Sequence, residues 1–259
     1  MTTGPTAAKL HAGSFTMSLP RFHLPASSWS SPQLCLADDE AAHCARVMRK
    51  APGDRIEIFD GEGRLAECEI TQVGKNAVQA QIVAESRIEP FRTAIHLFPA
   101  LIKAEPFEWL LEKAVELGAA GIHPVVTERT MIHLDAAQAG KKLARWRRHM
   151  IESAKQCHTP FVPWIEGPVS FRSVVSDIKA DIKLMPALSE HSRTLKQLIP
   201  PSPPGVVAVL IGPEGDFSPE EEAEAQQAGF LPVTLGQLIL RAETAAISTL
   251  AILGHELRR

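Results

Sequence analysis

The sequence predicts an α/β protein of two domains, a β-rich domain that ends near residue 89 and a larger one with a parallel sheet. Three observations lead to this prediction. Residues 55–83 alternate between apolar and polar side chains, as half-buried strands do. From residue 94 onward, continuous apolar runs alternate with segments of helical periodicity, which is typical of βαβ units. The chain of 259 residues is long enough for two domains of ordinary size.

The first domain, residues 17–89, is predicted to be a small β-barrel. Residues 55–59 and 64–70 alternate on either side of a turn that contains two glycines, which is the pattern of a β-hairpin. Residues 77–83 supply a third strand. Several short strands within so few residues favour a barrel over an open sheet.

The turn of this hairpin carries a misleading motif. Gly61, Gly63 and Ala66 match the spacing of the dinucleotide-binding fingerprint. That fingerprint needs a helix after its glycines, so that the helix N-terminus can meet a pyrophosphate. Strand-like alternation follows instead, and a nucleotide-dependent dehydrogenase is therefore disfavoured.

The second domain, residues 90–259, is predicted to begin with a strand, a helix and a strand. Residues 94–102 are almost entirely apolar, as in a strand buried on both faces. Pro106 suits the first turn of a helix, and Gly118 suits its end. The remaining predicted elements are a strand at 122–126, a helix at 143–154, strands at 181–185, 206–211 and 231–235, and a closing helix at 244–257.

Composition sets limits on the environment of the protein. The chain is 45% hydrophobic and 22% charged, with a formal net charge of −3, as expected of a globular protein. No apolar run approaches the roughly 18 residues of a bilayer-spanning helix. Residues 1–16 lack a secretory pattern, and we expect an extension with little order there. The four cysteines form no C-x-x-C pair and the histidines show no ligand spacing, so we expect no metal site and a cytoplasmic location.

Residues 211–221 (IGPEGDFSPEE) are the most informative segment. A buried strand ends at Gly212, and Ser218 then precedes Pro219 with Glu221 three positions on, which is a capping box that opens a helix. A glycine turn between a parallel strand and a helix exposes backbone polar groups at the edge where α/β proteins bind ligands. The turn has two acidic residues and no lysine, so it suits a cationic sulfonium with a neutral adenosine better than a phosphate.

Residues 235–245 (LGQLILRAETA) repeat this arrangement after the next strand. Arg241, Glu243 and Thr244 lie where a helix begins. Beside an apolar run, the guanidinium of Arg241 could stabilise an anionic transition state. The alternative is that Arg241 and Glu243 only form an ion pair with each other.

These two segments together resemble the RsmE family of ribosomal RNA methyltransferases, within the SPOUT class. The resemblance covers nearly the whole chain, and its further stretches are residues 21–23, 43–49, 103–118, 127–130 and 155–156. It implies a PUA-like RNA-binding barrel at the N-terminus and a C-terminal domain whose trefoil knot forms the cofactor pocket. It also implies a homodimer, S-adenosylmethionine as the methyl donor, and N3 of a uridine in 16S ribosomal RNA of the small subunit as the acceptor.

Site residues follow from matching the family's motifs position by position. The positions implied to bind the cofactor are Leu188, Glu190, Ile211, Gly212, Pro213, Glu214, Gly215, Leu235, Gly236, Ile239, Leu240, Thr244 and Ala245. The resemblance implies that RNA is bound by Arg21, His43, Arg46, Arg49, Lys103 and Arg129, and the clustering of basic residues adds Lys50, Lys141, Arg145 and Arg148. Many members have an arginine soon after the position of Gln156, whereas this chain reads CHTPF at 157–161, so no RNA contact is assigned there.

For the reaction, we expect Arg241 to stabilise the anionic uracil and leave the general base open between Glu243 and His191. At helical spacing, Lys141, Arg145 and Arg148 share a face that could contact phosphates. Two other functions remain open. A knotted methyltransferase could act on transfer RNA or on a ribose 2′-hydroxyl, and a protein of this fold could be a ribosome-associated RNA-binding factor without catalysis.

Overall fold

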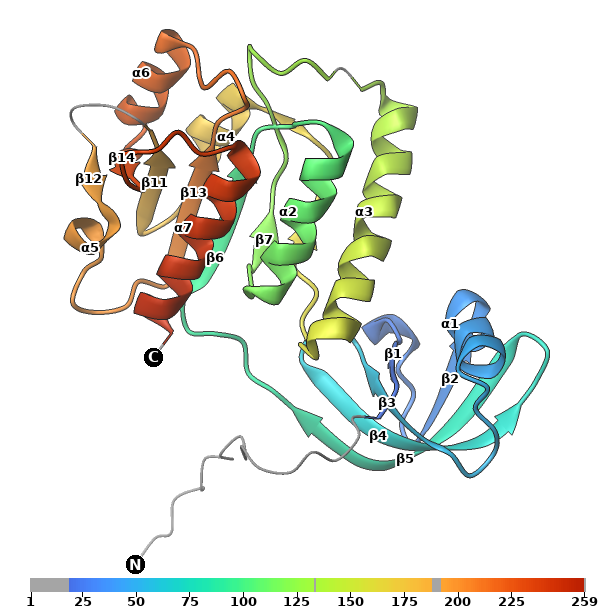
Figure 1. The fold of residues 1–259 in the computed structure, drawn as a ribbon. Helices are drawn as coiled ribbons and strands as arrows, with labels where there is room; N and C mark the ends of the chain where they lie inside the picture. Colours follow the sequence, from blue (N-terminus) through green and yellow to red (C-terminus); the bar gives the residue numbers. More distant parts are fainter. Residues whose placement is uncertain (1–18, 133, 188–191, 259) are drawn as a thin grey trace, which may run out of the picture.

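The computed structural model describes residues 19–132, 134–187 and 192–258. It has two parts, a curled β-sheet at the N-terminus and a larger α/β domain (Figure 1). The predicted extension at residues 1–16, and Leu188, Glu190 and His191, lie outside the described residues. None of the described helices combines the length and apolar character that crossing a membrane requires.

The N-terminal part is a five-stranded sheet in the order β1-β3-β4-β5-β2. Its strands are β1 (Arg21–His23), β2 (Gln33–Ala37), β3 (Arg55–Phe59), β4 (Arg64–Val73) and β5 (Ala77–Arg87). A 3-10 turn (η1, Ala26–Ser28) follows β1, and helix α1 (Asp38–Ala42) continues into a π-helical turn, η2 (His43–Val47). Inward-facing residues such as Phe22, Ile56 and Ile58 form a core of their own.

The predicted hairpin is confirmed, because β3 and β4 pair in antiparallel register. Gly61 and Gly63 lie in the turn between them with φ of 82° and 103°, values that glycine adopts readily. A strand follows the glycines, not a helix, so the dinucleotide fingerprint is a coincidence of spacing.

The C-terminal domain is built on a seven-stranded sheet in the order β12-β14-β11-β13-β6-β7-β9, with every pairing parallel. Its strands are β6 (Ala94–Pro99), β7 (Gly121–Ile122), β9 (Trp164–Ile165), β11 (Ile182–Pro186), β12 (Arg193–Thr194), β13 (Val206–Ile211) and β14 (Leu231–Thr234). A two-stranded pair of β8 (Val125–Val126) and β10 (Val169–Ser170) lies beside it.

Helices cover both faces of this sheet (Figure 1). On one side lie α2 (Ala104–Glu116), α3 (Ala136–Cys157) and α7 (Ala242–Leu257), and on the other lie α4 (Phe171–Asp177) and α6 (Pro219–Gln227), while the short α5 (Leu195–Leu198) follows β12. Strand β13 shows why its sequence is apolar throughout. Val207 and Val209 belong to the core under α2 and α7, while Ala208 and Leu210 belong to the core under α4 and α6.

Two predicted elements differ from the structure. The strand expected at 122–126 is split into β7 and β8, which pair with different strands, because Pro124 between them has no N–H for a ladder. Helix α3 begins at Ala136, well before the predicted residue 143, and Asp135 and Gln138 cap it reciprocally. Its first turns carry few apolar residues, so hydrophobic periodicity does not reveal them.

Strand β14 enters the sheet between two strands that are neighbours in the sequence. Pro186 at the end of β11 and Arg193 at the start of β12 both lie opposite Val233 of β14. The later strand therefore lies between the two earlier ones in the sheet, although it follows both in the sequence. This order places the end of β14 beside the end of β11, whose other neighbour is β13.

The C-terminal end of α3 joins the two parts. Lys155, which is 8% exposed, forms ion pairs with Glu40 of α1 and with Glu152. Beyond the helix, the amide of Val162 donates to the Gly61 carbonyl at 2.9 Å, and that of Gly63 donates to the Pro160 carbonyl at 3.2 Å. The N-terminal sheet, which is curled but whose end strands β1 and β2 do not pair as in a closed barrel, is thus held by hydrogen bonds on either side of its hairpin turn.

A histidine pair in the C-terminal domain predicts a pH dependence of stability. His96 Nδ1 lies 3.1 Å from His123 Nε2, and His123 Nδ1 lies 2.6 Å from Glu166 Oε1. Burial, and then the charge of His123, lower the pKa of His96 below its ordinary value of 6.5. The unfolded chain therefore binds this proton more readily than the folded one, and the free energy of unfolding should fall as the pH drops below about 6.5.

Urea denaturation at a series of pH values checks this. The substitution His96→Gln should flatten the slope below about pH 6.5, since it removes the titrating group. A smaller slope should remain, because burial also lowers the pKa of His23. The exposed His255 gives the matched control, since His255→Gln should leave the slope as it is. An unchanged slope in His96→Gln would contradict the assignment.

Candidate active site

A cavity of about 120 Å³ lies where the carboxyl ends of β11, β13 and β14 meet. The predicted cofactor residues that line it are Ile211, Gly212, Pro213, Glu214, Leu235, Gly236, Ile239, Leu240 and Ala245. Gly215 and Thr244 do not line it. The two glycine-containing segments, separate in the sequence, thus form one site because parallel strands end at the same edge of the sheet.

Local chemistry shapes the two loops. Gly236 has φ of 124°, which a residue with a Cβ rarely adopts. The Gly236 amide donates a hydrogen bond to Thr234 Oγ1 at 3.2 Å. In the other loop, the Asp216 amide donates to the Pro213 carbonyl at 2.9 Å and closes a turn. The predicted capping box follows, with Ser218 accepting from the Glu221 amide. The turn and cap together fix the path of the chain between β13 and α6.

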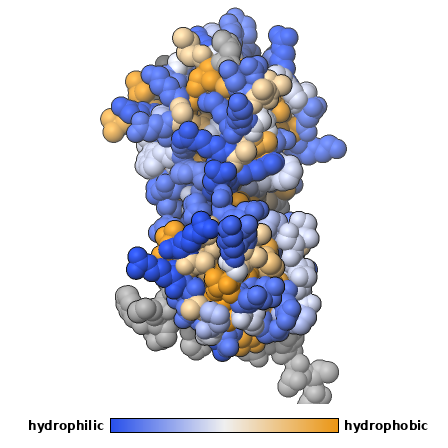
Figure 2. All heavy atoms as spheres, turned by 90° about the vertical axis from the view of Figure 1, so that its right-hand side faces the viewer, coloured by the Kyte–Doolittle hydropathy of each residue, from blue (hydrophilic) through white to orange (hydrophobic). Residues whose placement is uncertain are grey.

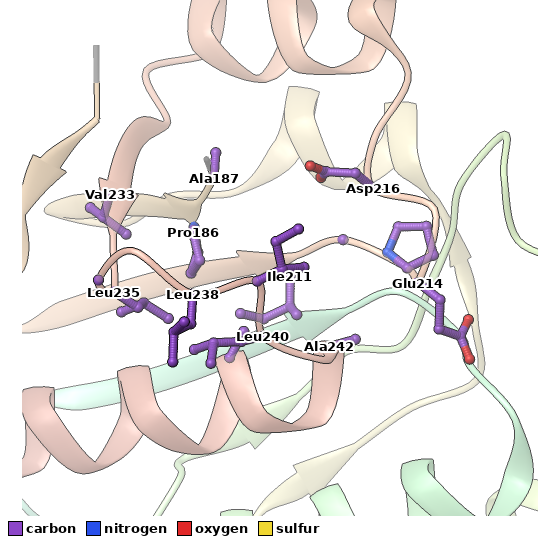
Figure 3. A pocket seen from close by; sticks show the side chains of 15 residues that line it. Pro186, Ala187, Ile211, Glu214, Asp216, Val233, Leu235, Leu238, Leu240 and Ala242 are labelled. Carbon is purple, nitrogen blue, oxygen red and sulfur yellow. The ribbon is translucent and has the colours of Figure 1, made fainter. Parts of the chain in front are cut away.

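The walls of the cavity are aliphatic and acidic. Figure 3 shows Leu238 and Leu240 on one side of it and the carboxylates of Glu214 and Asp216 toward its other end. The described residues that line it include no lysine or arginine. A site of this kind favours a ligand with apolar surface and positive charge over a phosphate.

Sequence reasoning missed six lining residues. They are Pro186, Ala187, Asp216, Val233, Leu238 and Ala242. Asp216, Leu238 and Ala242 fall inside the two motifs, so their positions could have been included. Pro186 ends β11, the strand between β13 and β14, and Ala187 follows it, so the strand order explains why they belong here. The expected cofactor positions at Leu188 and Glu190 come directly after them in the sequence.

Arg241 and Glu243 do not pair with each other. Arg241 is exposed at the N-cap of α7, and its guanidinium has no hydrogen-bond or ion-pair partner in the described part of the chain. Glu243 is 7% exposed in the first turn of the same helix. The interpretation as a mutual ion pair is therefore wrong. Neither side chain lines the cavity, but Leu240 and Ala242 on either side of Arg241 do.

Comparison with known proteins decides the family. Residues 89–254 match the model of an RNA methyltransferase domain, and residues 36–83 match an RNA methyltransferase PUA domain. The ribosomal RNA small subunit methyltransferase E of Mycobacterium bovis is 31% identical over 83% of this chain and 84% of its own length. The chain belongs to the ribosomal RNA small subunit methyltransferase E family.

Solved members of this fold agree. The methyltransferase E of Neisseria gonorrhoeae bound to S-adenosylmethionine superimposes with a TM-score of 0.83 at 31% identity, over 91% of this chain and 96% of that one. A putative methyltransferase of Legionella pneumophila with bound S-adenosylmethionine gives a TM-score of 0.85 at 32% identity, over 92% of this chain and 98% of that one. The predicted α/β fold, with a PUA domain before a parallel-sheet methyltransferase domain, is thereby confirmed.

The residues that we expect to bind RNA differ in their exposure. Six cationic side chains are exposed: Arg46, Arg49, Lys103, Lys141, Arg145 and Arg148. Lys50 and His43 are half-buried. Arg145 also pairs with Glu108 at 2.8 Å, but the Arg145 side chain remains 70% exposed. These residues stay candidates for RNA contact.

Two more of the predicted RNA ligands hydrogen-bond to other parts of the protein, although Arg129 is also exposed to solvent. Arg21 is buried, pairs with Glu57, and donates to the Thr159 carbonyl at 3.1 Å, so it ties β1 to the segment after α3. Arg129 Nη1 donates to two carbonyls, those of Gly215 at 2.6 Å and Phe217 at 3.1 Å. Both guanidinium groups are therefore turned toward protein carbonyls and carboxylates.

Arg129 positions the loop that forms one wall of the cavity. The residue before it, Glu128, holds the helix that follows the loop, because the Glu128 amide donates to Glu221 Oε1 of α6 at 2.8 Å. The other carboxylate oxygen of Glu221 accepts from the Ser218 amide. The segment thus holds both the loop and the cap of α6 in place.

Replacing Arg129 with alanine should weaken binding of S-adenosylmethionine about tenfold, or about 1.4 kcal/mol, because the loop loses two hydrogen bonds and must be ordered on binding. The exposure of Arg129 keeps this cost below the full value of two charge-assisted bonds. Calorimetric titration measures this. Arg129→Lys should lose less affinity for the cofactor. Arg172→Ala is the control and should lose none, because the Arg172 side chain is 87% exposed. Unchanged cofactor affinity with weaker RNA binding would return Arg129 to the RNA surface.

Proposed function

We propose that this protein transfers a methyl group from S-adenosylmethionine to N3 of a uridine in 16S ribosomal RNA of the small subunit. The observation that carries the proposal is the cavity between the two glycine-containing strand ends, in a chain of a family whose solved members hold S-adenosylmethionine. Ribosomal RNA is the substrate that the names of its relatives state.

The residues present fit this cofactor. Bound there, S-adenosylmethionine would supply an electrophilic methyl group on a sulfonium. Glu214 and Asp216 contribute negative charge that favours a cation. Leu235 and Leu240 offer apolar surface for an adenine ring.

Arg241 is the residue we assign to charge stabilisation. N3 of uracil must lose a proton to become nucleophilic, and the resulting charge spreads onto two carbonyl oxygens. A guanidinium presents paired donors to such oxygens, and Arg241 is exposed and unpaired in the described structure, beside the cavity wall. Glu243 is buried, so it could act as the base that takes the N3 proton only after a local rearrangement. His191 is the other candidate.

The assembly we propose is a cytoplasmic homodimer. Leu238 and Ile239 support it, because these aliphatic side chains are 77% and 86% exposed next to the site, and exposed apolar surface of this kind is typical of protein interfaces. For RNA, the exposed Lys141 and Arg148 of α3 offer contacts to phosphates.

The test is to incubate the protein with S-adenosylmethionine and either small ribosomal subunits or free 16S RNA, and to map the product by mass spectrometry. A single 3-methyluridine is the expected result. Methylation of a ribose, or of transfer RNA in a parallel reaction, would assign the protein to another substrate. Calorimetric titration with S-adenosylmethionine, without RNA, tests the remaining alternative. A ribosome-associated RNA-binding factor without catalysis would bind no cofactor.

A further inference from the structure

A second, shallow and open cavity lies at the junction of the two domains, and none of its lining residues is shared with the cofactor cavity. The N-terminal part contributes Arg21, His43 and Met48 to its lining, among others. The end of α3 and the residue after it contribute Glu152, Lys155, Gln156 and His158. Ligand sites occur preferentially at domain junctions, and an open site of this kind suits a group that enters from solvent, such as one nucleotide.

The backbone around this junction cavity is unusual at three places. His43 opens a π-helical turn, a form that is rare and frequent at functional sites. Arg49, next to Met48, has φ of 52°, and His158 has φ of 60°, values in the left-handed region that few non-glycine residues adopt. Strained residues gather at ligand sites, where the surrounding structure holds them in place.

The charges at the floor of the junction cavity are already compensated. Arg21 pairs with Glu57, and Lys155 pairs with Glu40 and Glu152. A phosphate placed there would have to compete with these carboxylates. With two cations and three carboxylates, the floor does not attract an anion.

The remaining lining is what a nucleobase requires. The Gln156 side chain is exposed and makes no hydrogen bond to any other described residue, so its amide can donate and accept at once. Met48 is 41% exposed and offers an apolar surface, while His43 offers a ring. A base has two apolar faces and an edge that both donates and accepts, and glutamine pairs with such edges.

Cations for the flanking phosphates lie outside the cavity. Arg49 and Lys50 follow Met48 directly, and neither has an ion-pair partner among the residues that the structure describes. Figure 2 looks onto this side and shows hydrophilic side chains over α3 and the junction, with an apolar area on the barrel beneath. An RNA strand crossing here would meet positive charge at its backbone and a neutral pocket for a base.

We propose that the junction cavity binds one unpaired base of the RNA substrate, from a nucleotide other than the one that is methylated. This rests on the proposed function. The two cavities have no lining residue in common, since one lies at the ends of β11, β13 and β14 and the other at the end of α3 beside the N-terminal sheet, so we place different nucleotides at the two (Figure 1). The cavity would thus hold the RNA in register while the target uridine reaches the cofactor.

The experiment compares the full-length protein with the double variant Met48→Ala/Gln156→Ala, using a fragment of 16S RNA that contains the mapped uridine. Affinity for this RNA should fall about tenfold or more, as expected for losing a base contact, with kcat at saturating RNA and the Kd of S-adenosylmethionine unchanged. Val47→Ala is the matched control, because Val47 is adjacent and 68% exposed but does not line the cavity. It should bind RNA as the wild type does.

Three outcomes separate the possibilities. Wild-type affinity in the double variant overturns the junction site while leaving the methyltransferase proposal intact. Competition by inorganic phosphate that is lost in the double variant would show an anion site, and would also overturn it. Failure of the wild-type protein to methylate any RNA would instead overturn the proposed function.

Discussion

Replacing Arg241 with alanine should lower the turnover number by about 10²-fold or more, the loss seen when a donor to developing negative charge is removed. The side chain has no partner in the described structure and gives no cap hydrogen bond to α7, so its removal should cost little stability. The Kd of S-adenosylmethionine should change little, because only the residues on either side of Arg241 line the cavity. Steady-state kinetics with saturating RNA and calorimetry measure the two quantities separately.

The conservative variant sharpens this result. Arg241→Lys keeps the charge but not the paired donors, so its turnover should lie between those of the wild type and the alanine variant. A melting temperature close to that of the wild type excludes a folding defect. If turnover is preserved and cofactor binding is weakened, Arg241 belongs to the cofactor site and has no part in the chemistry.

Substituting Gly63 with alanine should destabilise the protein by roughly 2–5 kcal/mol, from about 1–2 for the left-handed backbone and about 1–3 for overpacking. Gly63 has φ of 103°, and an added Cβ would lie 2.6 Å from the Ile88 carbonyl oxygen and 2.9 Å from a ring carbon of Phe161. These atoms belong to the segments that connect the barrel to the second domain. The loss should therefore appear in denaturation of the whole protein.

Gly53→Ala is the matched control for that variant. Gly53 lies in the same domain with φ of 93°, and an added Cβ there would meet nothing within 4 Å. It should show only the backbone cost, about 1–2 kcal/mol. The difference between the two variants, measured by urea denaturation, gives the cost of crowding at the domain junction. Equal losses would show that packing around Gly63 relaxes freely.

Much of the fold could be predicted because its signals are local. Val206–Ile211 is apolar at every position, and the structure makes it a strand with cores on both faces. Ser218, Pro219 and Glu221 open α6 as the capping box predicts. The two segments at 211–221 and 235–245 meet as expected, since parallel strands end at the same edge of the sheet.

The structural roles of two arginines could not be predicted, because their partners are distant in the sequence. The guanidinium of Arg129 reaches the Gly215 carbonyl, 86 positions away along the chain. Arg21 reaches the Thr159 carbonyl, 138 positions away. Charge alone does not show which side chains also bond within the protein, so these roles could be found only from the structure.

The sequence by itself determined the two-domain order, the hairpin, the buried strands, the capped helix after Ser218 and the two glycine turns. These depend on periodicity and on the conformational freedom of residues close together in the chain. Only the tertiary structure decided that β14 passes between β11 and β12, that Pro186 and Ala187 join the cofactor cavity, and that a second cavity opens between barrel and α3. Each of these depends on which distant segments lie side by side. The packing of the whole chain decides this, because burial of apolar surface stabilises contacts without specifying their direction.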